Sequence, residues 1–206
     1  MPITSIILAG GKSSRLGSEK ALEQISGKSL VELTIDCLSP ISQAIIVATS
    51  QELINPFKAA QLKAKVILDL YPGKGALGGV CTGLASADTY YSLIVGCDMP
   101  FLNRDLLLYL INSAPGFDAV APEINGMIEP LHAIYSEDCL MPIRQLLDQG
   151  ELSVSKLFSL VKTKYVSQGK IDEFDPEHLS FFNINTQDDL KRAKSIISYN
   201  ASLAQM

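Results

Sequence analysis

The stretch ITSIILAGGKSSRLGSEK, residues 3–20, decides the fold, because an apolar run passes directly into a loop rich in glycine and basic side chains. The run Ile3–Leu8 predicts a buried strand. Similar short apolar runs, separated by segments of helical period, lie at Ala44–Ala48, Lys65–Leu68, Ser92–Cys97 and Asp118–Ala121. This alternation predicts an α/β fold of βαβ units, with a mostly parallel central sheet, helices on both faces and ligands beyond the carboxyl ends of the strands.

The pattern changes after about residue 122, where turns and short strands replace the βαβ alternation. The pair Asn125-Gly126 predicts a hairpin turn, since both residue types tolerate positive φ. Further strands are expected at Pro130–Tyr135, at a sheet edge over Lys164–Val166, and at Phe181–Asn185. Helices are expected at about Asp138–Gln149, at Ser153–Leu160, and after Thr186, which is placed to cap the last one. We see no repeat or linker, and expect one domain over residues 1–206.

Composition and charge exclude some classes of partner. The chain is 47% hydrophobic and 19% charged, as in an ordinary globular protein. Its 17 basic and 22 acidic side chains give a net charge of -5, so a broad nucleic-acid or anionic-membrane surface has no electrostatic support. No segment approaches the roughly 20 apolar residues that cross a bilayer, and the four cysteines form no CxxC pair. We therefore expect a soluble, cytoplasmic protein with buried, reduced thiols.

The loop after the first predicted strand carries the donors of a polyphosphate site. It reads Gly10-Gly11-x-Ser13-x-Arg15-x-Gly17-x-x-Lys20. Glycines let backbone N–H groups turn toward an anion, and Ser13 adds a hydroxyl donor. Arg15 offers a planar fork to phosphate oxygens, and Lys20 offers a point charge. The spacing differs from that of a P-loop; the alternative is a Gly-Ser turn with solvated basic residues.

A second glycine-rich loop, DLYPGKGALGG at residues 69–79, follows the third predicted strand. It contains GxGxxG, but as a dinucleotide fingerprint this is weak, because Pro72 opens the loop as a turn and a cationic loop already occupies the first βα position. We interpret the loop, with Gly78, as the wall beside which a base and ribose lie, and Asp69 as a polar contact. A purely structural turn is the alternative.

Asp98 is the candidate metal ligand. It ends the predicted strand over Ser92–Cys97 and is followed by a proline turn. A carboxylate in this place is typical of a Mg²⁺ site, since Mg²⁺ prefers oxygen ligands and keeps several waters and substrate phosphate oxygens. The alternative is an N-cap for the helix expected from about Arg104, for which Asn103 is better placed.

Two further segments allow two interpretations each. The segment Glu129-Pro130-Leu131-His132 either reaches a second substrate, or His132 is a core or surface histidine. The segment Asn183-Ile184-Asn185-Thr186 is either a capped strand-to-helix turn or a ligand contact.

Four of these motifs, taken in order, resemble the MobA-type molybdenum cofactor guanylyltransferases of the nucleotidyltransferase superfamily. They are GGxSxRxGxxK at 10–20, PGKGALGG at 72–79, VGCDMPF at 95–101 and FFNINTQDDL at 181–190. The resemblance implies a Rossmann-like nucleotidyltransferase fold, with a nucleotide-binding part at about residues 1–102 and an acceptor-binding part at about 103–206. It implies transfer of GMP from GTP to the phosphate of molybdopterin, with Mg²⁺ as cofactor and other molybdenum cofactor biosynthesis proteins and recipient molybdoenzymes as partners.

The resemblance also implies roles for single residues. Leu8, Ala9 and Gly10 match a segment whose backbone contacts the nucleotide, Asp98 matches the Mg²⁺ ligand, and Ser50 falls near a position where some relatives have a nucleotide-contacting asparagine. The expected nucleotide-binding residues are Leu8, Ala9, Gly10, Gly11, Ser13, Arg15, Lys20, Ser50, Asp69, Gly78 and Asp98. Catalysis is expected from Arg15, Lys20 and Asp98, because attack on an α-phosphorus needs positioning and charge neutralisation rather than a protein nucleophile.

Two other functions stay open. One is nucleotide transfer with another base or acceptor, such as cytidylyl transfer to the same pterin or transfer to a sugar phosphate or phospholactate. The other is a nucleotide-binding module without turnover, for which loss of Arg15, Lys20 or Asp98 would be the expected mark.

Overall fold

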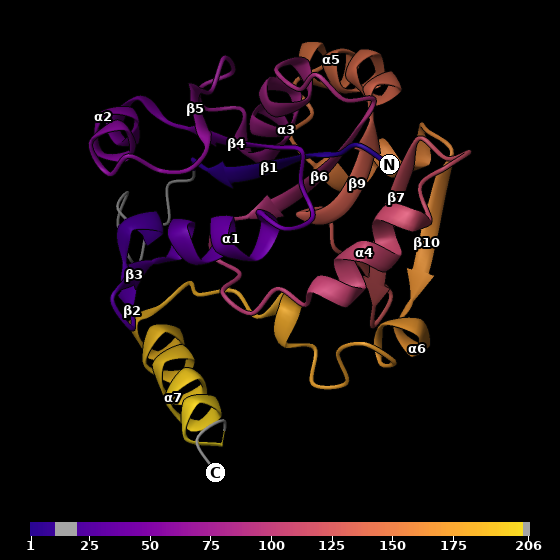
Figure 1. The fold of residues 1–206 in the computed structure, drawn as a ribbon. Coiled ribbons are helices and arrows are strands. Elements are labelled where there is room, and N and C mark those ends of the chain that lie inside the picture. Colours follow the sequence, from indigo (N-terminus) through magenta and orange to yellow (C-terminus); the bar gives the residue numbers. More distant parts are fainter. Residues whose placement is uncertain (11–19, 204–206) are drawn as a thin grey trace.

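The computed structural model of the protein describes residues 1–10 and 20–203. Over these residues, eight strands form one central sheet in the order β10-β7-β9-β6-β1-β4-β5, with β8 beside β7 (Figure 1). The strands are β1 (Thr4–Ala9), β4 (Ala44–Thr49), β5 (Lys65–Leu68), β6 (Tyr91–Gly96), β7 (Ala119–Ile124), β8 (Met127–Ile128), β9 (His132–Ser136) and β10 (Thr163–Ser167). A separate small hairpin pairs β2 (Gln24–Ile25) with β3 (Lys28–Ser29).

The strand directions confirm the expected mostly parallel sheet. Strand β1 lies at the centre and pairs in parallel with β4 and β6, and β4 pairs in parallel with β5. Strand β9 is antiparallel to both β6 and β7, and β10 is parallel to β7. The carboxyl ends of β5, β4, β1 and β6 therefore meet at one edge, where a doubly wound sheet binds its ligands.

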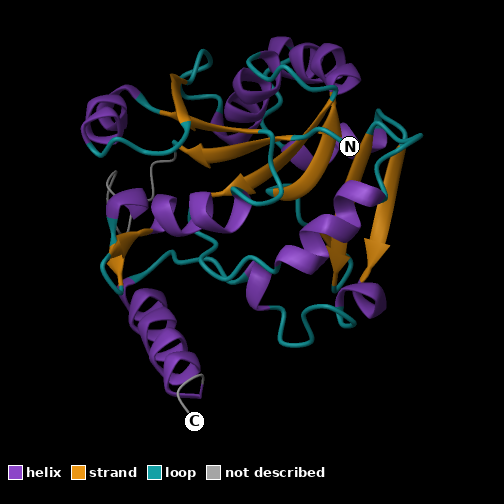
Figure 2. Cartoon of the chain, viewed as in Figure 1, coloured by secondary structure: helices purple, strands orange, loops and turns teal. Residues whose placement is uncertain are grey.

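Helices cover both faces of the sheet (Figure 2). They are α1 (Leu30–Leu38), α2 (Gln51–Ala59), α3 (Gly75–Ala85), α4 (Arg104–Asn112), α5 (Leu140–Asp148), α6 (Gln168–Ile171) and α7 (Gln187–Leu203). Ile7 of β1 joins a core cluster with α1, α2 and α4, whereas its neighbour Ile6 joins a second cluster with α3 and α5. Successive residues of a strand face opposite sides, so the central strand is apolar on both faces.

Short 3-10 turns complete the described chain, at Lys20–Leu22, Glu137–Cys139, Val154–Ser159 and Leu179–Phe181. The turn at Val154–Ser159 takes the place of the short helix expected at Ser153–Leu160, and the turn at Glu137–Cys139 precedes α5. The β7–β8 hairpin is confirmed: Asn125 and Gly126 have φ values of 51° and 74°. The Asn103 side chain caps α4 by accepting a hydrogen bond from the Leu106 N–H at 3.0 Å.

The strand predicted at Phe181–Asn185 is wrong. This segment leaves a 3-10 turn and runs without a strand partner among the described residues. The Ile184 N–H donates to the Asp98 carbonyl oxygen at 3.0 Å, and the Ile184 side chain is buried against Ile25 and Leu190. The segment therefore has the apolar pattern of a strand but, among the described residues, lacks the ladder of hydrogen bonds to a neighbouring strand.

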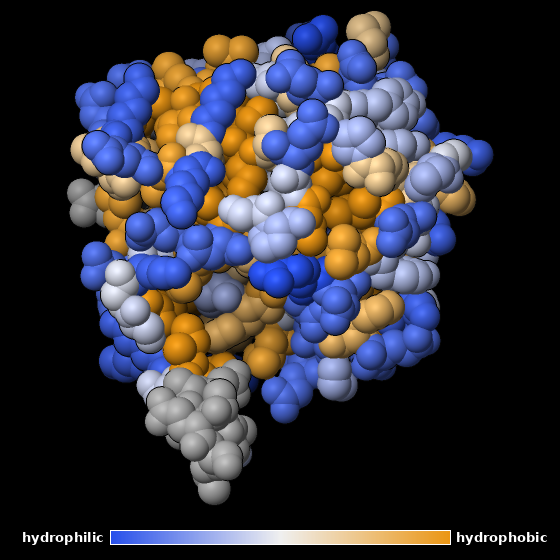
Figure 3. Space-filling model, in the orientation of Figure 1, coloured by the Kyte–Doolittle hydropathy of each residue, from blue (hydrophilic) through white to orange (hydrophobic). Residues whose placement is uncertain are grey.

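The last helix, α7, extends away from the rest of the molecule beyond the β2–β3 hairpin (Figure 1). Its start is fixed by a reciprocal cap, in which the Thr186 hydroxyl accepts from the Asp189 N–H at 3.1 Å and Asp189 accepts from the Thr186 N–H at 2.8 Å. None of the described helices is both long and apolar enough to cross a membrane. The face in Figure 3 carries hydrophilic residues throughout, with apolar side chains between them.

Candidate active site

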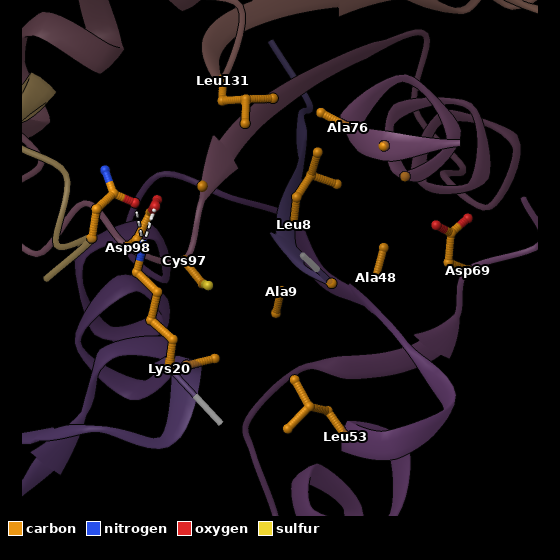
Figure 4. A pocket seen from close by; sticks show the side chains of 16 residues that line it. Leu8, Ala9, Lys20, Ala48, Leu53, Asp69, Ala76, Cys97, Asp98 and Leu131 are labelled. Atoms are coloured by element: carbon orange, nitrogen blue, oxygen red, sulfur yellow. Dashed lines mark hydrogen bonds and ion pairs between the residues drawn. The ribbon is translucent and has the colours of Figure 1, made fainter. Parts of the chain in front are cut away.

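A cavity of about 290 Å³ opens at the carboxyl ends of β1, β4 and β6. This volume is near the lower end of the range for small-ligand sites. The described lining residues are Leu8, Ala9, Gly10, Lys20, Ala21, Ala48, Leu53, Asp69, Gly75, Ala76, Gly79, Gly96, Cys97, Asp98, Leu131 and Asn185. In Figure 4, Lys20 and Asp98 lie on one side of the cavity and Asp69 on the other, with Leu8, Ala9 and Ala48 between them.

The polar side of the cavity is built around the Lys20 ammonium group. Its Nζ donates to Asp98 Oδ2 at 2.7 Å and to Asn185 Oδ1 at 2.8 Å. The side chains are partly shielded, with exposed fractions of 10% for Lys20 and 24% for Asp98. Partial burial strengthens such a charge-assisted pair relative to a surface ion pair. The cavity thus contains a cation with a carboxylate oxygen and an amide oxygen each within hydrogen-bond distance of it.

The end of β6 positions Asp98. The Cys97 N–H donates to the Leu8 carbonyl oxygen at 3.1 Å, and the Asp98 carbonyl oxygen accepts from the Ile184 N–H. The carboxylate lies close over Gly96: a Cβ at that position would be 2.5 Å from Asp98 Oδ1. A side chain at position 96 would therefore displace the Asp98 carboxylate from its observed place.

The start of α7 positions Asn185. Asp189 Oδ2 accepts from the Asn185 N–H at 3.0 Å, and it also accepts from the N–H and the hydroxyl of Thr186. The hydrogen bond from the Asn185 N–H, followed by that from the Thr186 hydroxyl, lowers the pKa of the Asp189 carboxyl. Asp189 thus stays ionised and holds the turn that brings Asn185 to Lys20.

Asp69 directly follows β5 on the opposite side of the cavity. Its Oδ1 accepts from the Tyr71 N–H at 2.9 Å and from the Thr82 hydroxyl at 2.8 Å, while its N–H donates to the Thr49 carbonyl oxygen. These bonds fix the carboxylate between the second glycine-rich loop and α3. A largely apolar floor separates it from Lys20 (Figure 4).

The structure brings six of the predicted site residues together around the cavity, and two others are not among its described lining residues. Around the cavity lie Leu8, Ala9, Gly10, Lys20, Asp69 and Asp98. Ser50 is the N-cap of α2 and Gly78 is a packing glycine; neither is among the described lining residues. A Cβ on Gly78 would be 2.9 Å from the Tyr71 backbone oxygen, which explains glycine there without a ligand. Gly11, Ser13 and Arg15 lie outside the described residues, and their roles stay predictions.

Sequence reasoning left Asn185 undecided and did not single out Cys97 or Leu131 as site residues. Asn185 immediately precedes the cap of α7, which was the available signal. Cys97 lines the cavity, but burial, followed by the nearby Asp98 carboxylate, raises the pKa of its thiol to about 12. A protonated thiol is a poor nucleophile, so Cys97 contributes shape rather than chemistry.

His132 lies in the core rather than in the cavity. It is fully buried, its ring centroid is 4.6 Å from that of Phe181, and its ring nitrogens have no partner among the described residues. Burial lowers its pKa to about 4, so the ring is neutral at pH 7. Glu129 is half-buried, and desolvation raises the pKa of its carboxyl.

The fold is shared with a solved nucleotidyl transferase from Methanothermobacter, which superimposes with a TM-score of 0.75 at 18% identity, covering 97% of this chain and 99% of that chain. More specifically, the chain belongs to the MobA-like NTP transferase domain family, whose model matches residues 5–164. The carboxyl-end cavity thus lies in an enzyme of the nucleotidyltransferase class.

Relatives of known name resemble the chain over nearly its whole length. A probable molybdenum cofactor guanylyltransferase from Halalkalibacterium halodurans is 36% identical, with 90% of this chain and 94% of that protein covered. One from Pelotomaculum thermopropionicum is 31% identical, with 93% and 91% covered. The crystal structure of molybdopterin-guanine dinucleotide biosynthesis protein A from Archaeoglobus fulgidus superimposes with a TM-score of 0.82 at 30% identity, covering 95% of this chain and 99% of that chain.

Proposed function

We propose that this protein transfers GMP from GTP to the phosphate of molybdopterin, forming a molybdopterin guanine dinucleotide and releasing pyrophosphate. The observation that carries the proposal is the Lys20–Asp98 ion pair in the cavity at the carboxyl ends of the strands. The chain is 36% identical to a probable molybdenum cofactor guanylyltransferase. An oxygen of the acceptor phosphate forms a bond to the α-phosphorus of GTP. The bond from that phosphorus to the bridging oxygen breaks, and pyrophosphate leaves with the electron pair.

The described residues support a nucleotide lying across the cavity. The apolar floor suits a nucleoside, with Asp69 at its far side and the triphosphate toward Lys20 (Figure 4). Gly10 lets the end of β1 pass close to β4, since a Cβ there would be 3.2 Å from the Ser50 nitrogen. Lys20 then stabilises negative charge on the phosphates, and the predicted loop donors, Arg15 among them, would add to it.

The residues around Lys20 also fit Mg²⁺. Asp98 Oδ2 and Asn185 Oδ1 already accept from one cationic group, and oxygen atoms of these two kinds are Mg²⁺ ligands. The described residues contain no cluster of three or more His, Cys, Asp or Glu side chains able to hold a metal, so substrate phosphates and water would supply the remaining ligands. When bound, Mg²⁺ would neutralise phosphate charge and polarise the α-phosphate.

No protein nucleophile is needed, because an acceptor phosphate is already ionised at neutral pH. The cavity agrees with this: its buried Cys97 thiol is protonated. The chain's own residues therefore act by binding, orienting and neutralising the reactants. The cytoplasm as compartment, and contacts with other cofactor-biosynthesis proteins and recipient molybdoenzymes, belong to the same proposal.

A nucleotide panel tests the proposal. Pyrophosphate release is measured with GTP, CTP, ATP and UTP, with and without molybdopterin, in the presence of Mg²⁺. We expect release only with GTP and the pterin together. The variant Asp98→Asn keeps the side-chain shape but loses the charge, and should lower kcat by at least about 100-fold.

The matched control is Asp148→Asn, the same change at an exposed position near the end of α5. It should leave turnover within about twofold of wild type. Preference for CTP would instead favour the cytidylyl alternative. A folded Asp98→Asn variant with undiminished turnover would contradict the role given to Asp98.

A further inference from the structure

The Lys20 ammonium group occupies a seat made by two oxygen atoms from distant parts of the chain. One is Asp98 Oδ2, 78 residues away in sequence, and the other is Asn185 Oδ1, 165 residues away. We call this pair of oxygens the Asp98–Asn185 seat. A carboxylate and an amide oxygen that converge on one cation are the same donors that a hard divalent cation takes.

The seat is held by contacts that do not involve Lys20. The Asp98 carbonyl oxygen accepts from the Ile184 N–H, which ties the two segments together next to Asn185. Asp189 holds the Asn185 N–H at 3.0 Å, and the glycine at 96 leaves space for the Asp98 carboxylate. The two oxygens therefore stay close whichever cation lies between them.

The Lys20 ammonium group, by contrast, makes its described hydrogen bonds only to the two oxygens of the seat. It begins a 3-10 turn, Lys20–Leu22, directly after the predicted phosphate loop. A lysine side chain has a flexible four-carbon stem and three N–H donors, so its ammonium group can turn from the seat to a phosphate without a change of fold.

We propose that Lys20 is the resident cation of the Asp98–Asn185 seat in the nucleotide-free protein, and that a divalent cation enters the seat only when a triphosphate draws the ammonium group away. This inference rests on the proposed function for the identity of the triphosphate. A second cation at these oxygens would be repelled by the ammonium group, because like charges a few ångströms apart in a partly buried site disfavour each other. Lys20 is then a positioning residue that couples metal binding to nucleotide binding.

The coupling is reciprocal. If the triphosphate raises metal affinity by removing Lys20 from the seat, the metal must raise triphosphate affinity by the same factor. Metal alone binds weakly, because it must displace an ammonium group that already donates to both oxygens of the seat. Wild-type protein should accordingly bind metal and nucleotide together.

The test measures Mn²⁺ binding to the full chain by calorimetry, first without nucleotide. Lys20→Met removes the competing charge and keeps the apolar stem, so it should bind Mn²⁺ about tenfold more tightly than wild type. Lys20→Arg keeps a cation and should stay near wild type. The matched control is Lys28→Met, which removes the same charge from an exposed pair with Asp36 and should change Mn²⁺ affinity less than twofold.

A second arm adds a non-hydrolysable GTP analogue. In wild type the analogue should tighten Mn²⁺ binding, whereas in Lys20→Met this increase should be reduced about tenfold. The double variant Lys20→Met/Asp98→Asn should lose the gain seen with Lys20→Met alone. If Lys20→Met fails to unfold cooperatively, Lys20→Gln replaces it.

Mn²⁺ affinity for Lys20→Met no higher than for Lys28→Met would overturn the proposal. So would a gain that survives removal of the Asp98 charge. These binding results do not depend on turnover: a protein that shows the Mn²⁺ gain but no GMP transfer would contradict the proposed function and leave the seat intact.

Discussion

At the scale of single residues, the placement of Asp98 depends on its neighbour Gly96. A Cβ added at residue 96 would lie only 2.5 Å from Oδ1 of the Asp98 carboxylate. The variant Gly96→Ala should therefore push the carboxylate out of the seat while leaving the buried strand β6 paired. We expect kcat/KM for pyrophosphate release to fall by about 10- to 100-fold, since misplacement of a catalytic group by about 1 Å has this effect.

The control for Gly96→Ala is Gly169→Ala, where a Cβ meets no atom within 4 Å. Turnover in that variant should equal wild type. Circular dichroism and thermal unfolding would check that Gly96→Ala still folds. If a folded Gly96→Ala protein had the kcat/KM of wild type, the Asp98 carboxylate could shift without loss of activity, and the prediction would be wrong.

At the scale of elements, helix α3 packs unusually close to β1. Its glycines at 79 and 83 face that strand: a Cβ on Gly79 would be 3.3 Å from Leu8 Cδ2, and one on Gly83 would be 2.4 Å from Ile6 Cγ2. This approach brings the start of α3, with Gly75 and Gly79, to the wall of the cavity. The glycines of α3 thus account both for its close packing against β1 and for the shape of the cavity wall.

Gly83→Ala should destabilise the protein, although alanine has the higher helix propensity. Propensity favours alanine by up to about 1 kcal/mol, but overpacking against Ile6 costs about 1–3 kcal/mol, so the clash decides the sign. Urea unfolding would measure it as a lower midpoint at unchanged slope. A midpoint equal to or above wild type would mean that α3 can move off β1 at little cost.

Element positions could largely be predicted from the sequence, whereas their contacts could not. The ends of the strands expected from apolar runs lie within three residues of the observed ends, because apolar runs between helical segments are a local signal. The packing role of Gly83 could not be predicted, because it depends on Ile6, which lies far away in sequence. The same limit produced the wrong strand at Phe181–Asn185, in which the Ile184 N–H donates to Asp98 rather than to a neighbouring strand.

At the scale of the whole molecule, the rule that parallel sheets bind ligands at strand ends located most of the site. Leu8–Gly10 lie at the end of β1, and Asp69 and Asp98 follow β5 and β6, which end at the same edge. The rule did not locate Asn185, since this residue reaches the ligand-binding edge of the sheet from the start of α7 rather than from a strand. A sequence read without its folded contacts leaves such a residue undecided between a cap and a ligand contact.

The stability of the whole molecule should depend on pH through His132. Burial holds its pKa near 4 in the folded protein, well below the value of about 6.5 expected in the unfolded chain. Below pH 6.5 the unfolded state binds the proton more readily than the folded state, so the folded state loses stability as pH falls toward 4. Protonation of this group lowers the free energy of unfolding by at most about 3 kcal/mol at low pH. At pH 7 this destabilisation is absent.

The variant His132→Phe isolates that contribution, because phenylalanine keeps an aromatic ring against Phe181 and leaves no buried nitrogen without a partner. The free energy of unfolding in urea would be measured for both proteins at pH 7, 6 and 5. The difference, variant minus wild type, should grow by about 2 kcal/mol between pH 7 and pH 5, because carboxyl groups titrate in both proteins and cancel. A difference that stays constant over this range would mean that His132 accepts its proton in the folded core, and that the buried ring finds a partner on protonation.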